Sequence, residues 1–580
     1  MDKNKLELTV KTSPEVANAT YKPIPEKEIE EQALSRPTSL IKVKASPQVD
    51  GADEKMLPAD EEVIPEVVIF NNDGKSPQNG DTKMDFEDPK PAFVGLTKEE
   101  LMLYADDPFW VRLRLFLFLA FWFLWVAMLV GAVLIIYAAP KCDPPPPRTW
   151  YQQGPLTQLP ADTKPENLKL DDNIRGAIVQ WNADAYEPLE NNPQGLALIA
   201  TATKYGADVI VQVEPAISNV WFEKSEKSDP EFDNYYIWRN GNMQTTDSSV
   251  SPPNNWVSPN NVSSWKYSDT RREYYYAPFN KPHLNFRNKV VIEQFSKVIE
   301  KFFALANVKG ISLRNAAFLL VDSAFQNEEV NSNLDPDLTL TQYAFFKHSK
   351  TENLPQLGSL LQQWKDVIKN KTRTGLLMVA EDLSKVESYK VNGTLVVDMP
   401  LQSHIFSKAN ISVNETATSL NYTFNINAIE WPLWEAKTSA VPKDVLDIIT
   451  YLLPGAPLIN RTDVPAPVLL KIRHSPSIMR GICGVYSLSN NTILAFLRQR
   501  VTPGSPGILV AVNPTDSTQI ANFPEEIPLL TNLQDVTVRY YSHSYNETTF
   551  KDVGAKRGAS AVPVTGKSAI VLEYVPKKEE

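Results

Sequence analysis

The 580-residue chain contains only two cysteines and five histidines. This scarcity excludes a small scaffold held together by many disulfides, and it leaves little material for a metal centre built from Cys and His. The chain also lacks a CxxC pair, an HExxH motif, a Walker A loop and the glycine fingerprint of a Rossmann fold. We therefore expect neither a metal site nor a cofactor.

Positive charge is also in deficit. The net charge is −11 and the isoelectric point is near 5.3, which argues against a nucleic-acid partner. Most of the negative charge lies before residue 115, where the chain has 23 Asp and Glu but only 15 Lys and Arg. Residues 1–92 are rich in Pro, Glu, Lys and Ser and show no sustained hydrophobic period, which predicts a disordered tail. Residues 93–114 then predict a short helix and a membrane flank.

One long apolar segment follows. Leu115 to Ala139 are 25 residues without a charge, and at about 1.5 Å per residue a helix of this length spans roughly 37 Å. The hydrocarbon core of a bilayer is about 30 Å thick, so the segment predicts a tilted transmembrane helix. A buried core helix fits poorly, because soluble helices rarely stay apolar on every face. Trp110, Arg112 and Arg114 precede the segment and suit a layer of lipid headgroups.

Two small residues of this segment, Ala127 and Gly131, are four positions apart on one helix face. Small residues at this spacing allow a second helix to approach closely, so they are candidates for a partner interface. A chance pair is the competing interpretation.

Glycosylation sequons favour one orientation. A single Asn-x-Ser/Thr sequon, at Asn18, precedes the apolar segment, and nine follow it. These nine candidate glycosylation sites are Asn261, Asn370, Asn392, Asn410, Asn414, Asn421, Asn460, Asn490 and Asn546. Because N-glycans are added in the secretory pathway, we expect a single-pass type II glycoprotein with a signal anchor, a cytoplasmic N-terminus and an extracellular body.

A short stalk is expected at residues 140–149, where Cys142 precedes the prolines Pro144 to Pro147. Four consecutive prolines favour a stiff polyproline II spacer. Beyond it, apolar runs typical of buried parallel strands occur at 176–181, 208–215, 309–315, 375–382 and 393–400. Helical patterns at 193–205, 290–306 and 356–369 alternate with them. The alternation predicts an α/β architecture of the (β/α) barrel type over residues 150–461.

From about residue 462 the pattern changes to strands and turns. The runs ILAFLRQRV, GILVAVNP, DVTVRYYSH and SAIVLEYVP alternate with polar turn residues. This pattern predicts a separate antiparallel β domain over residues 462–580.

The stretch from Tyr235 to Asn315 resembles the α-amylase/maltase family of glycoside hydrolases. It contains YYIWRNGN, PPNNWVS, SSWKYSDTRREYYYAPFNKPHLNFRN and KGISLRN, and LLPGAPLI at 452–459 is similar to the end of the family's barrel. The resemblance implies a TIM-type barrel with an excursion at 223–287. Only about 60 residues separate Trp150 from Val213, which implies that the first barrel helix is lost or reduced.

The resemblance does not extend to the catalytic residues. A retaining glycosidase of this family needs an Asp nucleophile and a Glu acid/base. Arg314 occupies the place of the nucleophile, and Ser312 occupies the place of the Arg that precedes it. A guanidinium cannot attack an anomeric carbon, and it would repel a positively charged transition state. The resemblance therefore implies a pseudoenzyme.

Other family positions have changed as well. The substituted positions are Gln212, Ala216 and Ile217, for the family's Asp, Asn and His, and His283, for an Asp. Glu381 aligns with the acid/base Glu but has no nucleophile to work with. The family's Asn-His-Asp motif is missing near 420–435.

The stretches FVGLTKEELMLYADDPFWVRLR and FWFLWVAMLVGAVLIIYAAPKC resemble the heavy subunits of heteromeric amino acid transporters, in particular the 4F2 cell-surface antigen type. Members of this family are type II glycoproteins that join a multi-span light subunit by a disulfide and bring it to the plasma membrane. The resemblance implies a non-catalytic heavy subunit whose light partner carries the transport pathway. One departure is that this chain keeps the maltase-like excursion, which the 4F2 type lacks and the b(0,+) type has.

The resemblance assigns the intermolecular disulfide to Cys142. The other thiol, Cys483, lies in the apolar run RGICGVYSL, which favours a buried core position. A stiff Pro144–Pro147 spacer also makes a bond between the two cysteines difficult, because their Cα atoms would have to come within about 7 Å. Two other functions stay open: a surface receptor or adhesion glycoprotein, and a membrane-anchored α-glucosidase.

Overall fold

The computed structural model describes residues 98–138, 146–243, 250–332, 335–437, 440–500 and 505–576. It divides into two compact units, Met1–Ala139 and Pro140–Glu580. The expected tail 1–92, Asn18 and Cys142 lie outside the described residues, so the predictions on them remain predictions.

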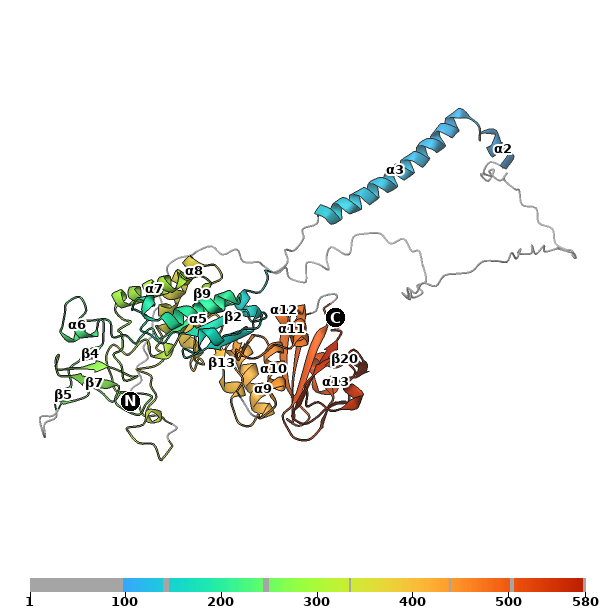
Figure 1. Cartoon of the computed structure of the whole chain (residues 1–580). Helices are drawn as coiled ribbons and strands as arrows, with labels where there is room; N and C mark the ends of the chain where they lie inside the picture. The colour runs from blue at the N-terminus through green and yellow to red at the C-terminus, as the bar shows by residue number, and fades with distance from the viewer. Residues whose placement is uncertain are drawn as a thin grey trace, which may run out of the picture. The chain divides into compact units, whose positions relative to one another are not determined.

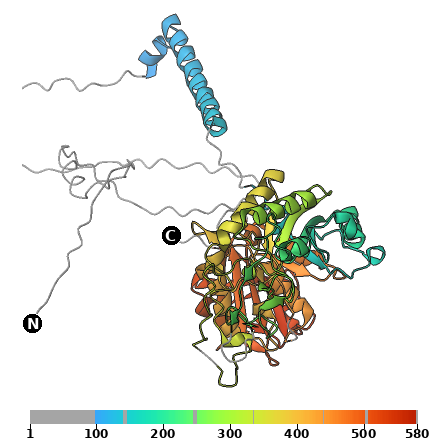
Figure 2. The same ribbon diagram turned by 90° about the vertical axis from the view of Figure 1, so that its left-hand side faces the viewer.

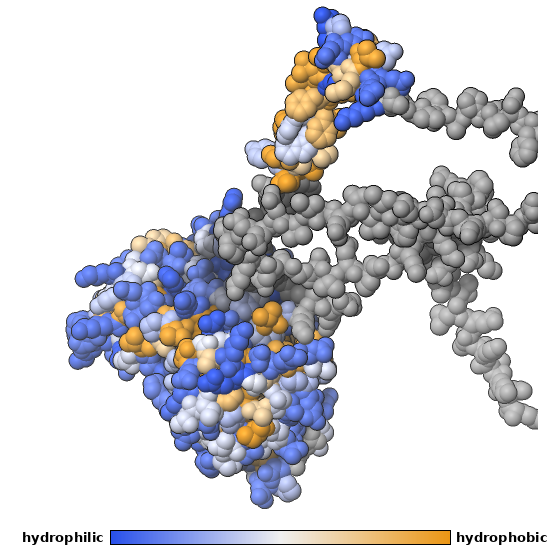
Figure 3. All heavy atoms as spheres, turned by 90° about the vertical axis from the view of Figure 1, so that its right-hand side faces the viewer, coloured by the Kyte–Doolittle hydropathy of each residue, from blue (hydrophilic) through white to orange (hydrophobic). Residues whose placement is uncertain are grey.

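The first unit contains two helices, α2 (Lys98–Leu103) and α3 (Pro108–Ala138). Helix α3 begins seven residues before the apolar run, because Pro108 suits a first helical turn and the Asp107 carboxylate accepts a hydrogen bond from Phe109 N at 2.9 Å. Its apolar side chains are exposed along the whole helix (Figure 3). Within the described residues, it is the one helix long and apolar enough to cross a membrane.

The second unit is built on an eight-stranded parallel sheet in the order β10-β9-β3-β2-β1-β15-β14-β13. A single parallel bridge between Asp382 and Leu401 links the two edge strands, so the sheet is a nearly closed barrel, which confirms the predicted fold class. The strands are β1 (Leu156–Leu159), β2 (Gly176–Gln180), β3 (Asp208–Val213), β9 (Val308–Leu313), β10 (Leu376–Val379), β13 (Leu401–Gln402), β14 (Leu433–Trp434) and β15 (Ala456–Ile459).

Amphipathic helices cover the barrel (Figures 1 and 2). They are α5 (Pro193–Lys204), α7 (Lys289–Phe303), α8 (Leu357–Lys371), α9 (Val413–Asn421) and α10 (Lys443–Leu452). Asn192 caps α5 by accepting a hydrogen bond from Gly195 N, and Asn288 caps α7 in the same way. Helices α7 and α8 lie side by side, and the rings of Phe295 and Trp364 meet edge to face with centroids 4.6 Å apart. The three predicted helical stretches are confirmed.

The connection from β1 to β2 contains only a short 3₁₀ turn, Pro165–Asn167, as its helical element. This agrees with the expected loss or reduction of the first barrel helix. Because no helix covers the carboxyl end of β1, residues of this loop line a cavity there.

The prediction of a buried parallel strand at 393–400 was wrong. The chain forms an antiparallel hairpin there, from β11 (Lys390–Val391) and β12 (Thr394–Leu395). Asn392 and Gly393 both have positive φ, at 50° and 74°, as a two-residue Asn-Gly turn requires. This turn decides the local structure, and the apolar residues that follow are buried without forming a strand. The barrel strand begins instead at Leu401.

The excursion between β3 and α7 forms a small lobe of its own (Figure 1). It holds α6 (Phe222–Glu226), the three-stranded sheet β4-β8-β7 and a two-stranded ribbon. Their bounds are β4 (Trp238–Arg239), β5 (Asn242–Met243), β6 (Val250–Ser251), β7 (Trp265–Ser268) and β8 (Glu273–Tyr276). Trp256, Trp265 and Tyr276 are buried in its core.

The C-terminal part begins with two short helices, α11 (Pro467–Arg473) and α12 (Pro476–Arg480). A six-stranded antiparallel sheet follows, in the order β16-β17-β18-β23-β20-β21, with the smaller β19-β22 pair and the short helix α13 (Phe523–Glu526) beside it. The strands are β16 (Ile482–Leu488), β17 (Ile493–Gln499), β18 (Gly507–Asn513), β19 (Gln519–Ala521), β20 (Asp535–Tyr541), β21 (Lys556–Gly558), β22 (Val562–Val564) and β23 (Ser568–Tyr574). The predicted antiparallel sheet is present, and its first strand starts at Ile482 rather than near 462.

Helix α4 (Trp150–Gln153) precedes β1 and closes the amino-terminal end of the barrel. Trp150 and Tyr151 pack against the apolar side chains inside the barrel. The fully buried Arg473 donates hydrogen bonds to the carbonyl oxygens of Gln152 and Gln153 at 3.1 and 2.7 Å, and to two further carbonyls of the barrel end. The chain therefore enters the barrel at its amino-terminal end, and the mouth lies at the opposite end.

Candidate functional site at the mouth of the barrel

The carboxyl ends of three adjacent barrel strands carry charged side chains. Glu214 follows β3, Arg314 follows β9, and Glu381 lies two residues beyond β10. The strands are held in register past their ends, since Arg314 N donates to the Val213 carbonyl at 2.8 Å and Ala380 N donates to Leu313 at 2.9 Å. In barrels of this type the active site is built at this face.

Asn315 joins the two acidic residues. Its backbone N donates to Glu381 Oε1 at 2.9 Å, and its side-chain Nδ2 donates to Glu214 Oε2 at 2.7 Å. Asn315 adopts a left-handed conformation with φ at 54°, which Asn tolerates better than most residues and which aims both donors inward. The sequence did not predict the roles of Glu214 and Asn315. Their place directly after two buried strand patterns was the available signal.

The two carboxyl groups share a desolvated setting. Burial raises the pKa of Glu214 to about 7, although the Arg314 guanidinium and the Asn315 amide oppose the shift. Burial also raises the pKa of Glu381, against the same arginine and the Asn315 backbone. Glu214 Oε1 is buried without a hydrogen-bond partner among the described residues. The cluster therefore keeps Glu214 partly protonated near neutral pH.

Two further predicted positions lie inside the barrel. Gln212 of β3 and Ser312 of β9 face each other in register and are buried. The structure thus brings Gln212, Ser312, Arg314 and Glu381 to one end of three neighbouring strands.

The remaining predicted positions connect the segment after β3 to the excursion. Ile217 and His283 form an antiparallel bridge, and Leu284 N donates to the Ala216 carbonyl at 2.8 Å. His283 is fully buried, which lowers its pKa to about 4, and its Nδ1 lies 2.9 Å from the Leu284 carbonyl oxygen. A neutral imidazole here packs against the ring of Tyr276. It therefore offers no charge to a ligand at the mouth.

The chemistry available at this cluster is limited. Two carboxyl groups with raised pKa values could exchange protons, and Arg314 could bind an anion. Within the described residues, no group of three or more His, Cys, Asp or Glu side chains is arranged to hold a metal ion.

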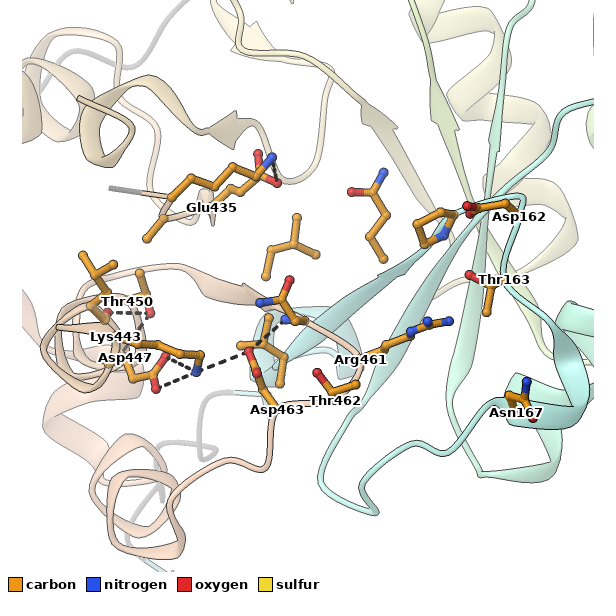
Figure 4. A pocket seen from close by; sticks show the side chains of 18 of the residues that line it. Asp162, Thr163, Asn167, Glu435, Lys443, Asp447, Thr450, Arg461, Thr462 and Asp463 are labelled. Carbon is orange, nitrogen blue, oxygen red and sulfur yellow. Dashed lines mark hydrogen bonds and ion pairs between the residues drawn. The ribbon is translucent and has the colours of Figure 1, made fainter. Parts of the chain in front are cut away.

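A separate cavity of about 790 Å³ opens at the ends of β1, β14 and β15 (Figure 4). Lys443, Asp447 and Thr450 of α10 lie on one side, and Asp162, Thr163 and Asn167 of the β1–β2 connection lie on the other, with Arg461 to Asp463 between them. The sequence analysis did not predict this cavity. The short connection after β1 was the signal that could have suggested it.

The structure distinguishes among the nine sequons of the body. Eight of these asparagines are exposed: Asn261, Asn370, Asn392, Asn410, Asn414, Asn460, Asn490 and Asn546. Asn421 is half-buried at the end of α9, where its Nδ2 donates to the Val485 carbonyl at 3.3 Å. The hydroxyl-bearing residue of that sequon, Thr423, is buried. Asn421 is therefore a poor acceptor for a glycan.

Cys483 lies half-buried in the edge strand β16 and is a free cysteine. Burial raises the pKa of its thiol to about 11, although the neighbouring Arg498 opposes the shift. A thiol that stays protonated is a weak nucleophile. Ala127 and Gly131 lie on α3, and a side chain placed at Gly131 would meet no other atom within 4 Å.

Comparisons with known proteins agree with both family resemblances, to transporter heavy subunits and to the α-amylase/maltase family. The family model for the N-terminus of solute carrier family 3 member 2 matches residues 81–157, and that for the α-amylase catalytic domain matches residues 195–447. The amino acid transporter heavy chain SLC3A1 of Rattus norvegicus is 25% identical over 427 residues, which are 63% of this chain and 60% of that protein. The chain is similar to amino acid transporter heavy chains. The human SLC3A1 heavy chain is 24% identical, with 65% and 62% of the two chains covered.

The chain thus spans about 60% of the length of these heavy chains. Maltase 1 of Drosophila virilis is 30% identical over 182 residues, covering 30% of this chain and 28% of the maltase. Among solved structures, a trehalulose synthase MutB variant superposes with a TM-score of 0.55 at 14% identity, covering 74% of this chain and 100% of the synthase. The last comparison shows the fold alone. The recognised resemblances, to transporter heavy chains and to the α-amylase/maltase family, are confirmed.

Proposed function

We propose that the chain is the non-catalytic heavy subunit of a heteromeric amino acid transporter. It joins a multi-span light subunit through a disulfide at Cys142 and brings that subunit to the plasma membrane. One observation carries the proposal: the same chain has an exposed apolar helix, in a stretch similar to the solute carrier family 3 N-terminus, and an amylase-type barrel in which Arg314 follows strand β9.

The lack of glycosidase activity follows from the mouth of the barrel. Double displacement at a sugar requires a carboxylate nucleophile facing a carboxylic acid. The position after β9 holds a guanidinium instead, and the two acidic groups nearby accept hydrogen bonds from Asn315, Glu381 from its backbone N and Glu214 from its side-chain Nδ2. Glu214 and Glu381 therefore hold the loops of the mouth together rather than act on a substrate.

Transport itself belongs to a partner. Substrate sites of secondary transporters are formed between several helices near the bilayer midplane, which one helix cannot provide. Helix α3 serves as the signal anchor, with residues 1–92 in the cytoplasm and the body outside the cell. Its Ala127–Gly131 face is the proposed contact for a helix of the light subunit.

Cys142 is the proposed site of the covalent link. It follows the last residue of α3 by four positions in the sequence, so a link there would form close to the outer end of the proposed membrane span. The competing thiol, Cys483, is half-buried, and its raised pKa makes it a weak nucleophile. A thiol in an oxidising compartment that lacks an internal partner forms a bond with another chain.

The test is co-expression of the full-length chain with a candidate light subunit, followed by non-reducing gels, surface biotinylation and amino acid uptake. The wild type should give a covalent heterodimer and surface uptake. Cys142→Ser should remove the covalent band, and the matched control Cys483→Ser should keep it. A covalent band that survives Cys142→Ser and disappears in Cys483→Ser would refute the link. Absence of uptake and of any complex would refute the subunit role.

Because the chain is similar to maltases, a second candidate function is that of a membrane-anchored α-glucosidase. The purified full-length chain should not hydrolyse maltose or a chromogenic α-glucoside. Turnover that disappears in Glu381→Gln would show that the acidic cluster is an active site and that the chain is an enzyme.

A further inference from the structure

The cavity at the ends of β1, β14 and β15 has no role in the proposed function. Its volume of about 790 Å³ is within the range of about 300–1,000 Å³ typical of small-molecule sites. We propose that it binds N-acetylglucosamine, supplied by the root of the chain's own N-glycan on Asn460. The proposal rests on the extracellular placement of the body in the proposed function.

Asn460 is held rigidly at the edge of this cavity. It is the residue directly after β15 and is one of the residues that line the cavity. Strand β15 is fixed against β1 by the pairing of Thr157 with Ile459, and Thr157 Oγ1 donates to the Ile459 carbonyl at 3.0 Å. A sugar attached to Asn460 would therefore leave the chain at the cavity, from a backbone that has little freedom to turn away.

The sequon itself is open to modification. Asn460, Arg461 and Thr462 are all exposed, and they form a turn in which Asp463 N donates to the Asn460 carbonyl at 3.0 Å. Asn460 N in turn donates to Asp463 Oδ2 at 3.2 Å. Among the described residues, the side-chain amide of Asn460 has no hydrogen-bond partner. Asn421 differs, because its side-chain amide already donates a hydrogen bond to the Val485 carbonyl.

The walls of the cavity suit a neutral polar ligand. Four basic side chains and four carboxylates line it, so the charges of the lining balance in sum. On the α10 side, Lys443 is paired with both Asp447 and Asp463, at 3.0 and 3.2 Å (Figure 4). Asp162 and Arg461 add an acceptor and donors on the other sides, and Leu446 and Leu458 add apolar surface. Hydroxyl and acetamido groups can use such walls, since sugars present polar edges and apolar faces.

Because the sugar is covalently attached to Asn460, weak contacts with the cavity are enough to keep it bound there. A group tethered by a short link reaches an effective concentration of about millimolar. A site that would bind free N-acetylglucosamine too weakly to detect can therefore hold the same sugar when it is attached to Asn460. The turn at the tip of the β11–β12 hairpin offers a natural contrast, because Asn392 is exposed there and a side chain placed at Gly393 would meet no atom within 4 Å.

The experiment uses the full-length glycoprotein purified from eukaryotic cells. Glycopeptide mass spectrometry gives the occupancy of Asn460 and Asn392. Peptide-N-glycosidase is then applied to the folded protein, and the release rate is measured at each site. We expect both sites to be occupied, with release at Asn460 at least tenfold slower than at Asn392, and equal release after denaturation. A tenfold difference corresponds to about 1.4 kcal/mol of contact.

Variants provide a second readout. Asn460→Gln and Thr462→Ala remove the same glycan by different changes, and both should lower the midpoint of thermal unfolding relative to Asn392→Gln. Equal release rates at the two sites would overturn the proposal, and so would an Asn460 that is unmodified while other sequons are occupied. If all nine body sequons are unmodified, the extracellular placement fails and the proposal fails with it.

Discussion

Replacing Glu214 by Gln should stabilise the protein, and the gain should depend on pH. The side chain keeps its shape, and the amide oxygen of Gln can still accept the 2.7 Å hydrogen bond from Asn315 Nδ2. The change removes a carboxyl group whose pKa burial raises from 4.5 to about 7. At about 1.4 kcal/mol per pH unit, this difference corresponds to about 3 kcal/mol of free energy.

The sign follows from proton binding in the two states. Between pH 4.5 and 7 the folded wild type keeps a proton on Glu214 that the unfolded chain has released. The stability of the wild type therefore falls as the pH rises through this window, and the loss is complete above about pH 7. Gln does not titrate, so the variant avoids the loss. The gain over the wild type should be about 3 kcal/mol at pH 8 and below about 1 kcal/mol at pH 5.

Urea unfolding of the full-length protein in detergent, followed by tryptophan fluorescence at pH 5 and pH 8, measures both values. The exposed Glu223 is the control, because Lys227 lowers its pKa and Glu223→Gln should give no gain at pH 8. Equal stability of Glu214→Gln and wild type at both pH values would refute the burial of this carboxyl group. A loss at pH 8 would show that ionised Glu214 is held by a stronger partner than Asn315.

Three further predictions concern other parts of the chain. Arg473→Met should lower the free energy of unfolding by about 3–5 kcal/mol in urea titrations, because buried carbonyl oxygens lose their donors, and a change below about 1 kcal/mol would contradict this. Arg314→Asp should not create α-glucosidase activity, since the other sugar-binding positions are also changed, and measurable turnover would show that this residue alone prevents catalysis. Asn421→Gln should leave the gel mobility unchanged, and a faster band would show that the half-buried sequon carries a glycan.

Much of the barrel could be predicted because its strands are continuous apolar runs between helical patterns. The runs that became β2, β3, β9 and β10 are buried on both faces, which is the usual pattern for parallel strands. The short strands β13 and β14 contain only two residues each, and such a length leaves no periodicity to recognise. At 393–400 the apolar run was misleading, because the Asn-Gly turn before it fixed a hairpin.

The candidate site was predictable only in part. Matching to family motifs selected Gln212, Ser312, Arg314 and Glu381, and the structure places all of them at the ends of neighbouring strands. Motif matching did not select Asn315, because it does not show which residue after a strand adopts a left-handed conformation and presents donors to two carboxylates. The cavity beside Asn460 was also missed, since it is formed between residues 158–167 and residues 435–463, which are far apart in the chain.

The two ends of the barrel differ in how well their polar groups are satisfied. At the amino-terminal end, the Arg473 guanidinium donates to four backbone carbonyls and fixes α4, where the chain enters the barrel. At the mouth, Glu214 has a buried oxygen without a partner, and two carboxyl groups have raised pKa values. In barrels of this type the amino-terminal end serves stability and the mouth serves chemistry. In the proposed function the mouth needs no reaction. Under that proposal, this division explains how the barrel keeps its packed core with Arg314 at the place where the family resemblance implies a nucleophile.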